Sequence, residues 1–222
     1  MAAAAEWLEG ARPRTLPTAI APVLAGTAIA ITDGGARWGL AALCLVVALG
    51  LVIGVNFAND YSDGVRGSDG DDRVGPLRLV GSGLAEPSHV RTAAFACFVV
   101  SAVAGLVITI MTGHWWFIAV GVVCILAAWF YTGGSHPYGY AGLGEIFVFI
   151  FFGLVAVGGT IYVQSGHVGA AGWVTACLIG ATACGVLTPI TCVTSTVIAS
   201  VASTPFRPSS GTRERGSSTL SW

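Results

Sequence analysis

Hydrophobic and polar residues are arranged along the chain in long blocks. Six apolar blocks reach or approach the roughly 20 residues that a helix needs to cross the hydrocarbon core of a bilayer. They lie at about residues 16–32, 38–59, 92–112, 115–131, 144–164 and 170–188. The pattern predicts an all-α fold, a polytopic membrane helix bundle with six transmembrane helices in this chain.

The composition supports a membrane protein. The chain has 222 residues, of which 55% are hydrophobic and 9% are charged, and its mean hydropathy is +0.79, whereas about 25% of the residues of a soluble domain are charged. Between residues 92 and 206 the only charged side chain is that of Glu145. The net charge of −1 and the lack of a basic stripe exclude a nucleic-acid partner. We expect the lipid bilayer to be the surroundings of most of the chain.

The arginines gather on one side of the predicted bundle. Two precede the first apolar block and four lie between the second and third blocks, whereas Arg37 stands alone on the other side. The first group comprises Arg12, Arg14, Arg66, Arg73, Arg78 and Arg91. Cytoplasmic loops of membrane proteins are enriched in basic residues. We therefore predict a multi-pass protein of the cell membrane whose N-terminus and polar loops at this end are cytoplasmic.

A polar stretch at residues 56–78, NFANDYSDGVRGSDGDDRVGPLR, stands where the second apolar block ends. On a helix, Asn56, Asp60 and Asp63 would lie within about 60° of one another. Their oxygens suit Mg²⁺, which usually binds through one or two carboxylates plus substrate phosphates. Carboxylates at the end of an apolar span are costly and usually functional. We predict that these three residues are metal ligands.

Three arginines, Arg66, Arg73 and Arg78, follow in the same stretch. The planar guanidinium matches two phosphate oxygens at once, so carboxylates, metal and arginines together predict a diphosphate site at the membrane surface. For the acidic residues of the loop itself, a solvated turn without a ligand is an equally good interpretation. These residues are Asp69, Asp71 and Asp72.

Two further features have alternative interpretations. Glu145 opens the fifth apolar block, where its charge either complements the positive N-terminus of a helix or lines a substrate cavity. The preceding segment TGGSHPYGYAGL, residues 132–143, is either a structured turn over the membrane face or an ordinary connector.

The motifs resemble those of a known family. NFANDYSDGVRGSD followed by DRVGPLRLVGSG resembles the first aspartate-rich motif of the UbiA-type intramembrane prenyltransferases. ARPRTLPTAIAPVLAGTA, YTGG and PYGYAGLGEIFVFIFFGLVAVGGTIYVQ are similar to the members that prenylate 1,4-dihydroxy-2-naphthoate in menaquinone biosynthesis. The resemblance runs from about residue 7 to residue 187.

The resemblance implies nine transmembrane helices around a central cavity and a Mg²⁺-dependent enzyme. That enzyme would transfer a polyprenyl group from polyprenyl diphosphate to the naphthoate acceptor, with decarboxylation, to give demethylmenaquinone. Asp60 and Asp63 would be the catalytic residues, and with Asn56 they would hold the metal. The residues that would bind the diphosphate are Arg66, Arg73 and Arg78.

The family pattern breaks near residue 188. The family has a second aspartate motif after the sixth helix, but this chain has no aspartate after Asp72. We therefore expect residues 1–188 to be the N-terminal two-thirds of a UbiA-type domain and residues 189–222 to be an aberrant, disordered tail. With this tail the 222-residue chain itself is expected to be inactive.

A shift of reading frame accounts for the tail. Codons for residues 189–199 can be chosen so that reading from the last base of each spells Asn-Asn-Leu-Arg-Asp-Ile-Asp-Ser-Asp-Arg, which resembles the second motif. The same shift over residues 201–206 can spell Gly-Lys-His-Thr-Leu, close to the segment that follows that motif. We hypothesise that the chain is a frameshifted form of a longer enzyme.

Other functions are compatible with the residues. A member of the same family can use another aromatic acceptor, such as 4-hydroxybenzoate or a haem or chlorophyll precursor. A cation transporter with Asp60 and Asp63 along its path is an alternative of another class, although transporter sites usually lie near the bilayer midplane. A catalytically inactive membrane remnant is the third.

Overall fold

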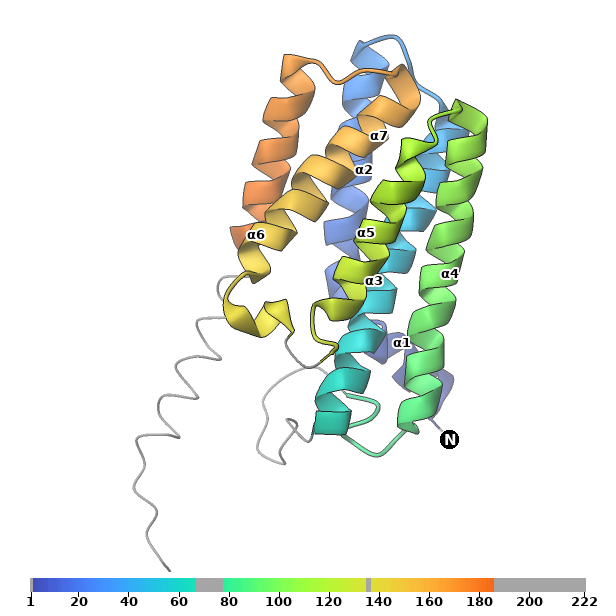
Figure 1. Ribbon diagram of the computed structural model, residues 1–222, viewed down its shortest axis with the longest axis vertical. Helices are drawn as coiled ribbons and strands as arrows, with labels where there is room; N and C mark the ends of the chain where they lie inside the picture. Colours follow the sequence, from blue (N-terminus) through green and yellow to red (C-terminus); the bar gives the residue numbers. More distant parts are fainter. Residues whose placement is uncertain (1, 67–77, 135–136, 186–222) are drawn as a thin grey trace, which may run out of the picture. The chain divides into compact units, whose positions relative to one another are not determined.

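The computed structural model describes residues 2–66, 78–134 and 137–185 (Figure 1). Within these ranges every regular element is helical, so the prediction of an all-α membrane bundle is confirmed. The predictions for Asp69, Asp71, Asp72 and Arg73 and for the tail at 189–222 concern residues outside the described ranges.

The helices follow one another along the chain. In chain order they are α1 (Ala4–Gly10), η1 (Pro13–Thr15), α2 (Leu16–Thr32), α3 (Trp38–Arg66), α4 (Pro87–Thr112), α5 (Trp116–Phe130), η2 (Tyr138–Ala141), α6 (Gly144–Val148), η3 (Phe149–Val155) and α7 (Ala156–Ser165). One more helix, Ala170–Gly185, is drawn in orange in Figure 1. The segment η3 has the wider π-helical turn and joins α6 to α7 in one helical stretch, Gly144–Ser165.

Each of the six predicted apolar blocks is helical in its described residues. Among the described helices, four stretches are long and apolar enough to cross a membrane, namely Ala4–Thr32, Trp38–Arg66, Pro87–Thr112 and Gly144–Ser165. The apolar helices Trp116–Phe130 and Ala170–Gly185 are shorter. Two boundaries differ from the prediction, because α3 runs beyond residue 59 to Arg66 and α4 begins at Pro87 instead of residue 92. Proline suits the first turn of a helix, where no N–H is needed.

Small residues allow neighbouring helices to approach closely, as is common in membranes. Where α2 packs against α7, a β-carbon on Gly26 would lie 2.9 Å from both Cβ of Thr160 and the carbonyl oxygen of Val157. Beside this contact, the buried Gln164 of α7 donates to Oγ1 of Thr27 at 3.0 Å and accepts from the backbone N–H of Arg37 at 3.2 Å. The close approach at Gly26 and the hydrogen-bonded side-chain amide of Gln164 therefore hold α2 against α7.

Replacing Gly26 by alanine is expected to destabilise the bundle by about 1–3 kcal/mol, because the added methyl group meets a backbone oxygen that cannot move alone. Thermal unfolding in detergent would show a fall in melting temperature of about 2–10 °C. The matched control is Gly105→Ala in α4, where nothing lies within 4 Å of the new β-carbon. An equal loss in both variants would contradict the close-packing explanation.

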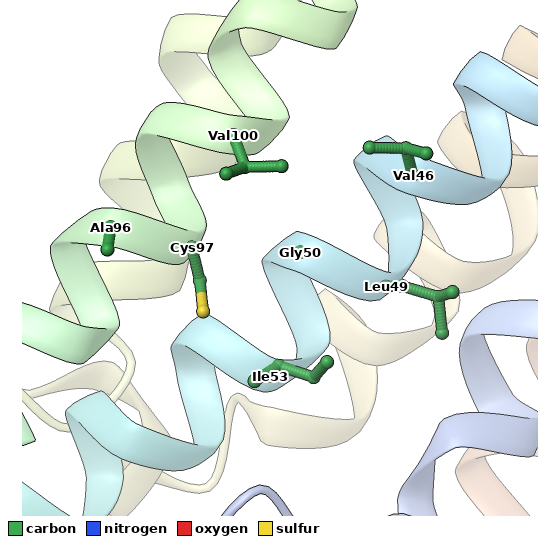
Figure 2. Close-up of a pocket in the computed structure, with 7 residues that line it drawn as sticks. All are labelled: Val46, Leu49, Gly50, Ile53, Ala96, Cys97 and Val100. Carbon is green, nitrogen blue, oxygen red and sulfur yellow. The ribbon is translucent and has the colours of Figure 1, made fainter.

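Among the described helices, α3 and α4 have the most extensive contact, and they lie side by side in Figure 1. Ser101 of α4 donates to the carbonyl oxygen of Val47 at 3.1 Å, and Gly54 packs against the ring of Phe98. A groove of about 350 Å³ remains between the two helices, lined by apolar side chains and Gly50 (Figure 2). Because no charged residue lines it, this groove suits lipid or acyl chains and does not suit a diphosphate.

Candidate functional site

The polar stretch at the end of the second apolar block stays helical. Because α3 continues to Arg66, its last turns carry the three predicted ligands on one face. Asn56, Asp60 and Asp63 are all buried, with 6%, 1% and 8% of their surface exposed. Charged and amide groups buried to this extent need partners, and the structure supplies a different partner for each.

Asn56 ties α3 to the junction that leads into α2. Its amide nitrogen Nδ2 donates to the carbonyl oxygen of Ala11 and to Oγ1 of Thr15, both at 2.9 Å. These two bonds fix the side-chain amide and leave its oxygen Oδ1 as the atom that can accept from or bind a ligand.

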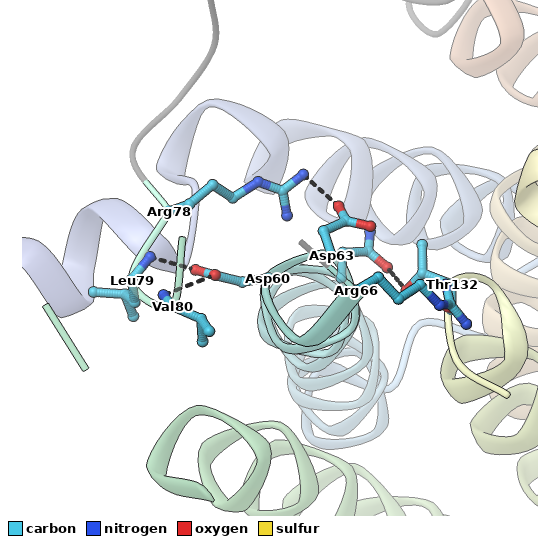
Figure 3. Close-up of polar contacts among 8 residues, drawn as sticks. Asp60, Asp63, Arg66, Arg78, Leu79, Val80 and Thr132 are labelled. Carbon is cyan, nitrogen blue, oxygen red and sulfur yellow. Dashed lines mark hydrogen bonds and ion pairs between the residues drawn. The ribbon is translucent and has the colours of Figure 1, made fainter. Parts of the chain in front are cut away.

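Asp60 holds the turn that leads into α4. Its Oδ2 accepts from the backbone N–H of Leu79 at 2.8 Å, and its Oδ1 accepts from that of Val80 at 3.1 Å (Figure 3). The positive charges of Arg78 and Arg12 also act on this carboxylate. Asp60 is therefore placed by backbone amides on one side and lies in the field of two arginines.

Two glycines make this turn fit. A β-carbon on Gly10 would lie 2.7 Å from Leu79, whose side chain is fully buried, and a β-carbon on Gly64 would collide with the side chain of Val80. None of these four residues was predicted from the sequence to belong to the site. Gly64 lies inside the acidic motif, and its lack of a side chain was the available signal.

Asp63 forms an ion pair with Arg78, with 2.6 Å between Oδ2 and Nη2 (Figure 3). The side chains are only 11% and 9% exposed. A buried pair of this kind is strongly destabilised when one partner is removed, because the other charge is then left without compensation. The structure thus brings the predicted diphosphate ligand Arg78 to the predicted metal ligand Asp63.

Arg66 is held by a different part of the chain. Its Nη1 donates to the carbonyl oxygen of Thr132 at 2.6 Å, and its Nη2 donates to that of Gly134. Figure 3 shows Arg66 reaching toward Thr132 while Arg78 reaches toward Asp63. Arg66 and Arg78 are therefore directed to different elements. The assignment of Arg66 and Arg73 to the diphosphate stays a prediction.

The described residues between α5 and α6 agree with the structured-turn interpretation. Tyr138 donates its hydroxyl to the carbonyl oxygen of Ala127 at 2.7 Å, and its ring stacks on Phe147 with 4.0 Å between centroids. Burial raises the pKa of Tyr138 above its usual range, with a smaller contribution from Tyr131. The phenol therefore stays protonated near neutral pH and remains a donor.

Glu145 opens α6, near Tyr131. Burial, and then the charge of Glu145, raise the pKa of Tyr131 above its usual range. The carbonyl oxygen of Glu145 accepts from Sγ of Cys184 at 3.1 Å, which joins α6 to the helix Ala170–Gly185. A position in the first turn agrees with the helix-terminus interpretation of this carboxylate, and its role in a cavity stays a prediction.

The donor set at the end of α3 fits a hard cation that prefers oxygen. In the part of the chain that the structure describes, no group of three or more His, Cys, Asp or Glu side chains forms a metal cluster. What it offers is two carboxylates and one amide oxygen, enough for Mg²⁺ when substrate phosphates complete the coordination shell. Each carboxylate oxygen has two lone pairs, so the bonds from Leu79, Val80 and Arg78 leave acceptor capacity.

Comparison with known proteins identifies the family. The model of the UbiA prenyltransferase family matches residues 19–206, which is most of the chain. The chain belongs to the UbiA prenyltransferase family. As a member of this family with several long apolar helices, it is a multi-pass membrane protein.

Individual UbiA relatives share one name. The chain is 58% identical over 187 residues to the 1,4-dihydroxy-2-naphthoate octaprenyltransferase of Mycobacterium tuberculosis, covering 84% of this chain and 63% of the relative. The enzyme of the same name from Mycobacterium leprae is 57% identical over the same shares. That of Escherichia coli is 40% identical, over 82% of this chain and 59% of its own. The chain thus spans about three-fifths of the length of the relatives that it matches.

Proposed function

We propose that this protein acts in the Mg²⁺-dependent transfer of a polyprenyl group from polyprenyl diphosphate to 1,4-dihydroxy-2-naphthoate, with release of diphosphate and loss of the carboxylate as CO₂ to give demethylmenaquinol, the reduced form of demethylmenaquinone. The names of its most similar relatives support the acceptor. The observation that carries the chemistry is the burial of Asn56, Asp60 and Asp63 on one face at the end of α3, with Arg78 paired to Asp63.

The residues at the end of α3 would act on the leaving group. Asn56, Asp60 and Asp63 would hold Mg²⁺, which supplies positive charge to the departing diphosphate when bound. Arg78, with Arg73 beside it in sequence, would bind phosphate oxygens and stabilise the charge that develops there.

The apolar helices would protect the reactive carbon. The bond between the allylic carbon and the diphosphate oxygen breaks, the oxygen keeps the electron pair, and the electron-rich naphthoate ring forms the new carbon–carbon bond. Exclusion of water by the surrounding helices prevents hydrolysis of the allylic cation. The polar groups are therefore needed only where the diphosphate lies, at the end of α3.

The orientation in the membrane is part of the proposal. Because Asn56 contacts Ala11 and Thr15, the N-terminal segment with Arg12 and Arg14 lies at the same end of the helices as the end of α3. Arg78 is held at this end too. We propose, by the enrichment of basic residues in cytoplasmic loops, that this end faces the cytoplasm.

Ligand binding separates the proposed function from a cation transporter. The 222-residue chain in lipid nanodiscs is expected to bind a polyprenyl diphosphate in the presence of Mg²⁺ and to release it when the metal is chelated. Liposomes that contain the chain are expected to show no cation flux above that of empty liposomes. Metal-independent binding, or flux that Asp60→Asn abolishes, would overturn the proposal in favour of transport.

A further inference from the structure

Two side chains of α3 hold the loop that follows α5. Oδ1 of Asn59 accepts from Oγ1 of Thr132 at 2.6 Å. Arg66 donates to the backbone carbonyl oxygens of Thr132, at 2.6 Å, and of Gly134. Thr132 is 5% exposed, so these contacts are made to a buried residue. We call Asn59 and Arg66, with Thr132 and Gly134, the loop clasp.

The loop clasp is close to one of the predicted catalytic residues on the helix. Asn59 and Arg66 are seven residues apart and so lie within about 20° of each other around α3. Asp63 comes four residues after Asn59 and three before Arg66, the spacings that place side chains on one helical face. The loop clasp therefore holds the same helical turns that carry Asp63.

The loop passes this restraint on to α6. The backbone N–H of Gly139 donates to the carbonyl oxygen of Tyr131 at 3.0 Å, and a β-carbon on Gly139 would lie 2.6 Å from that same oxygen. Tyr131 and Tyr138 meet edge to face with 5.5 Å between their centroids, and Tyr138 stacks on Phe147. A displacement of the loop at Thr132 would thus also displace Tyr131 and Tyr138, because these residues are in close contact with Gly139 and Phe147.

We propose that Asn59 and Arg66 are positioning residues, which hold the loop 131–134 and the aromatic segment beyond it in register with the carboxylates at the end of α3. Arg66 acts through the loop, where its planar fork binds two carbonyl oxygens, and Arg78 acts on the diphosphate. The consequence for prenyl transfer rests on the proposed function, whereas the restraint on the loop does not.

The two roles of Arg66 give different expectations. A residue that binds the diphosphate weakens diphosphate binding when it is lost. A residue that holds two carbonyl oxygens with a rigid fork is not replaced by lysine, which is a flexible point charge. Its loss frees the loop, weakens an aromatic ligand that depends on the loop, and leaves diphosphate binding unchanged.

Hydrogen–deuterium exchange of the 222-residue chain in nanodiscs tests the restraint directly. Peptides that cover residues 131–139 are expected to exchange about 3- to 10-fold faster in Arg66→Gln, Arg66→Lys and Asn59→Ala. Arg37→Gln, an exposed arginine at the other end of α3, is the matched control and is expected to leave exchange unchanged. Unchanged exchange in Arg66→Gln would overturn the proposal.

Ligand affinities supply the second measurement. In Arg66→Gln and Arg66→Lys, the Kd of a polyprenyl diphosphate with Mg²⁺ is expected to stay within about twofold, and the Kd of 1,4-dihydroxy-2-naphthoate to rise by about tenfold. In Arg78→Gln the diphosphate Kd is expected to rise instead. A diphosphate Kd that rises in Arg66→Gln as it does in Arg78→Gln would show a phosphate contact and overturn the proposal. Failure of the unmodified chain to bind either ligand would count against the proposed function, while the exchange result would still decide the loop clasp.

Discussion

Replacing Asp60 by asparagine is expected to weaken Mg²⁺-dependent binding of polyprenyl diphosphate by about 10- to 100-fold and, in the form whose reading frame is restored after residue 188, to lower prenyl transfer by at least about 100-fold. Asparagine has nearly the same shape, but it removes the negative charge that a metal requires. It also puts an NH₂ donor in place of one of the two oxygens that accept from the amides of Leu79 and Val80. Titration of binding with Mg²⁺ and a radiolabelled transfer assay measure the two effects.

The control for Asp60→Asn is the same change at Asp33, an exposed residue just beyond α2. Asp33→Asn is expected to match the unmodified protein in both measurements. Melting temperatures of both variants separate a lost ligand from a lost fold. If Asp60→Asn kept its affinity for Mg²⁺ and diphosphate while its melting temperature fell, Asp60 would be an anchor of the Leu79–Val80 turn and not a metal ligand.

Restoring the shifted reading frame after residue 188 is expected to have the second large effect, with prenyl transfer rising from a barely measurable level to that of an ordinary enzyme. The sequence contains no aspartate after Asp72, whereas the shifted reading of residues 189–199 contains three. A second set of carboxylates would help to bind the Mg²⁺ that stabilises the negative charge of the leaving diphosphate. Membranes that contain either form would be assayed with naphthoate, polyprenyl diphosphate and Mg²⁺.

The control for the frame experiment is a frame-restored form whose new aspartates are replaced by asparagine. This control is expected to transfer prenyl groups as slowly as the 222-residue chain. Two results would contradict the hypothesis. One is a gene whose codons for residues 189–199 do not permit the shifted reading, and the other is ordinary Mg²⁺-dependent turnover by the 222-residue chain.

The helices were predictable because each needs only a long apolar block. The sequence placed all six, and it erred where polar residues continue a helix. Hydropathy alone ended the second span at residue 59, but α3 runs on to Arg66. Its polar turns remain helical because Asp60 finds the amides of Leu79 and Val80, and Arg66 finds the carbonyl oxygen of Thr132. Such partners come from other segments, so local sequence does not reveal them.

The face shared by Asn56, Asp60 and Asp63 was predictable from helical spacing, but the partners of each side chain were not. All three arginines of the motif looked equivalent as phosphate ligands. The structure directs Arg78 to Asp63 and Arg66 to the loop after α5, a difference that depends on where the end of α5 packs. The glycines at positions 10 and 64 likewise acquire meaning only when Leu79 and Val80 are seen against them.

The contacts of Asp60 and Asp63 also bear on the order in which the protein assembles. They join residues that are only 15 to 20 positions apart in the chain. Contacts between near neighbours in sequence form early, because little chain entropy is lost in closing the loop. The segment from α3 to α4 therefore supplies hydrogen-bond partners for both carboxylates as soon as these two helices have entered the membrane. Assembly of this half of the site does not have to wait for the helices that follow.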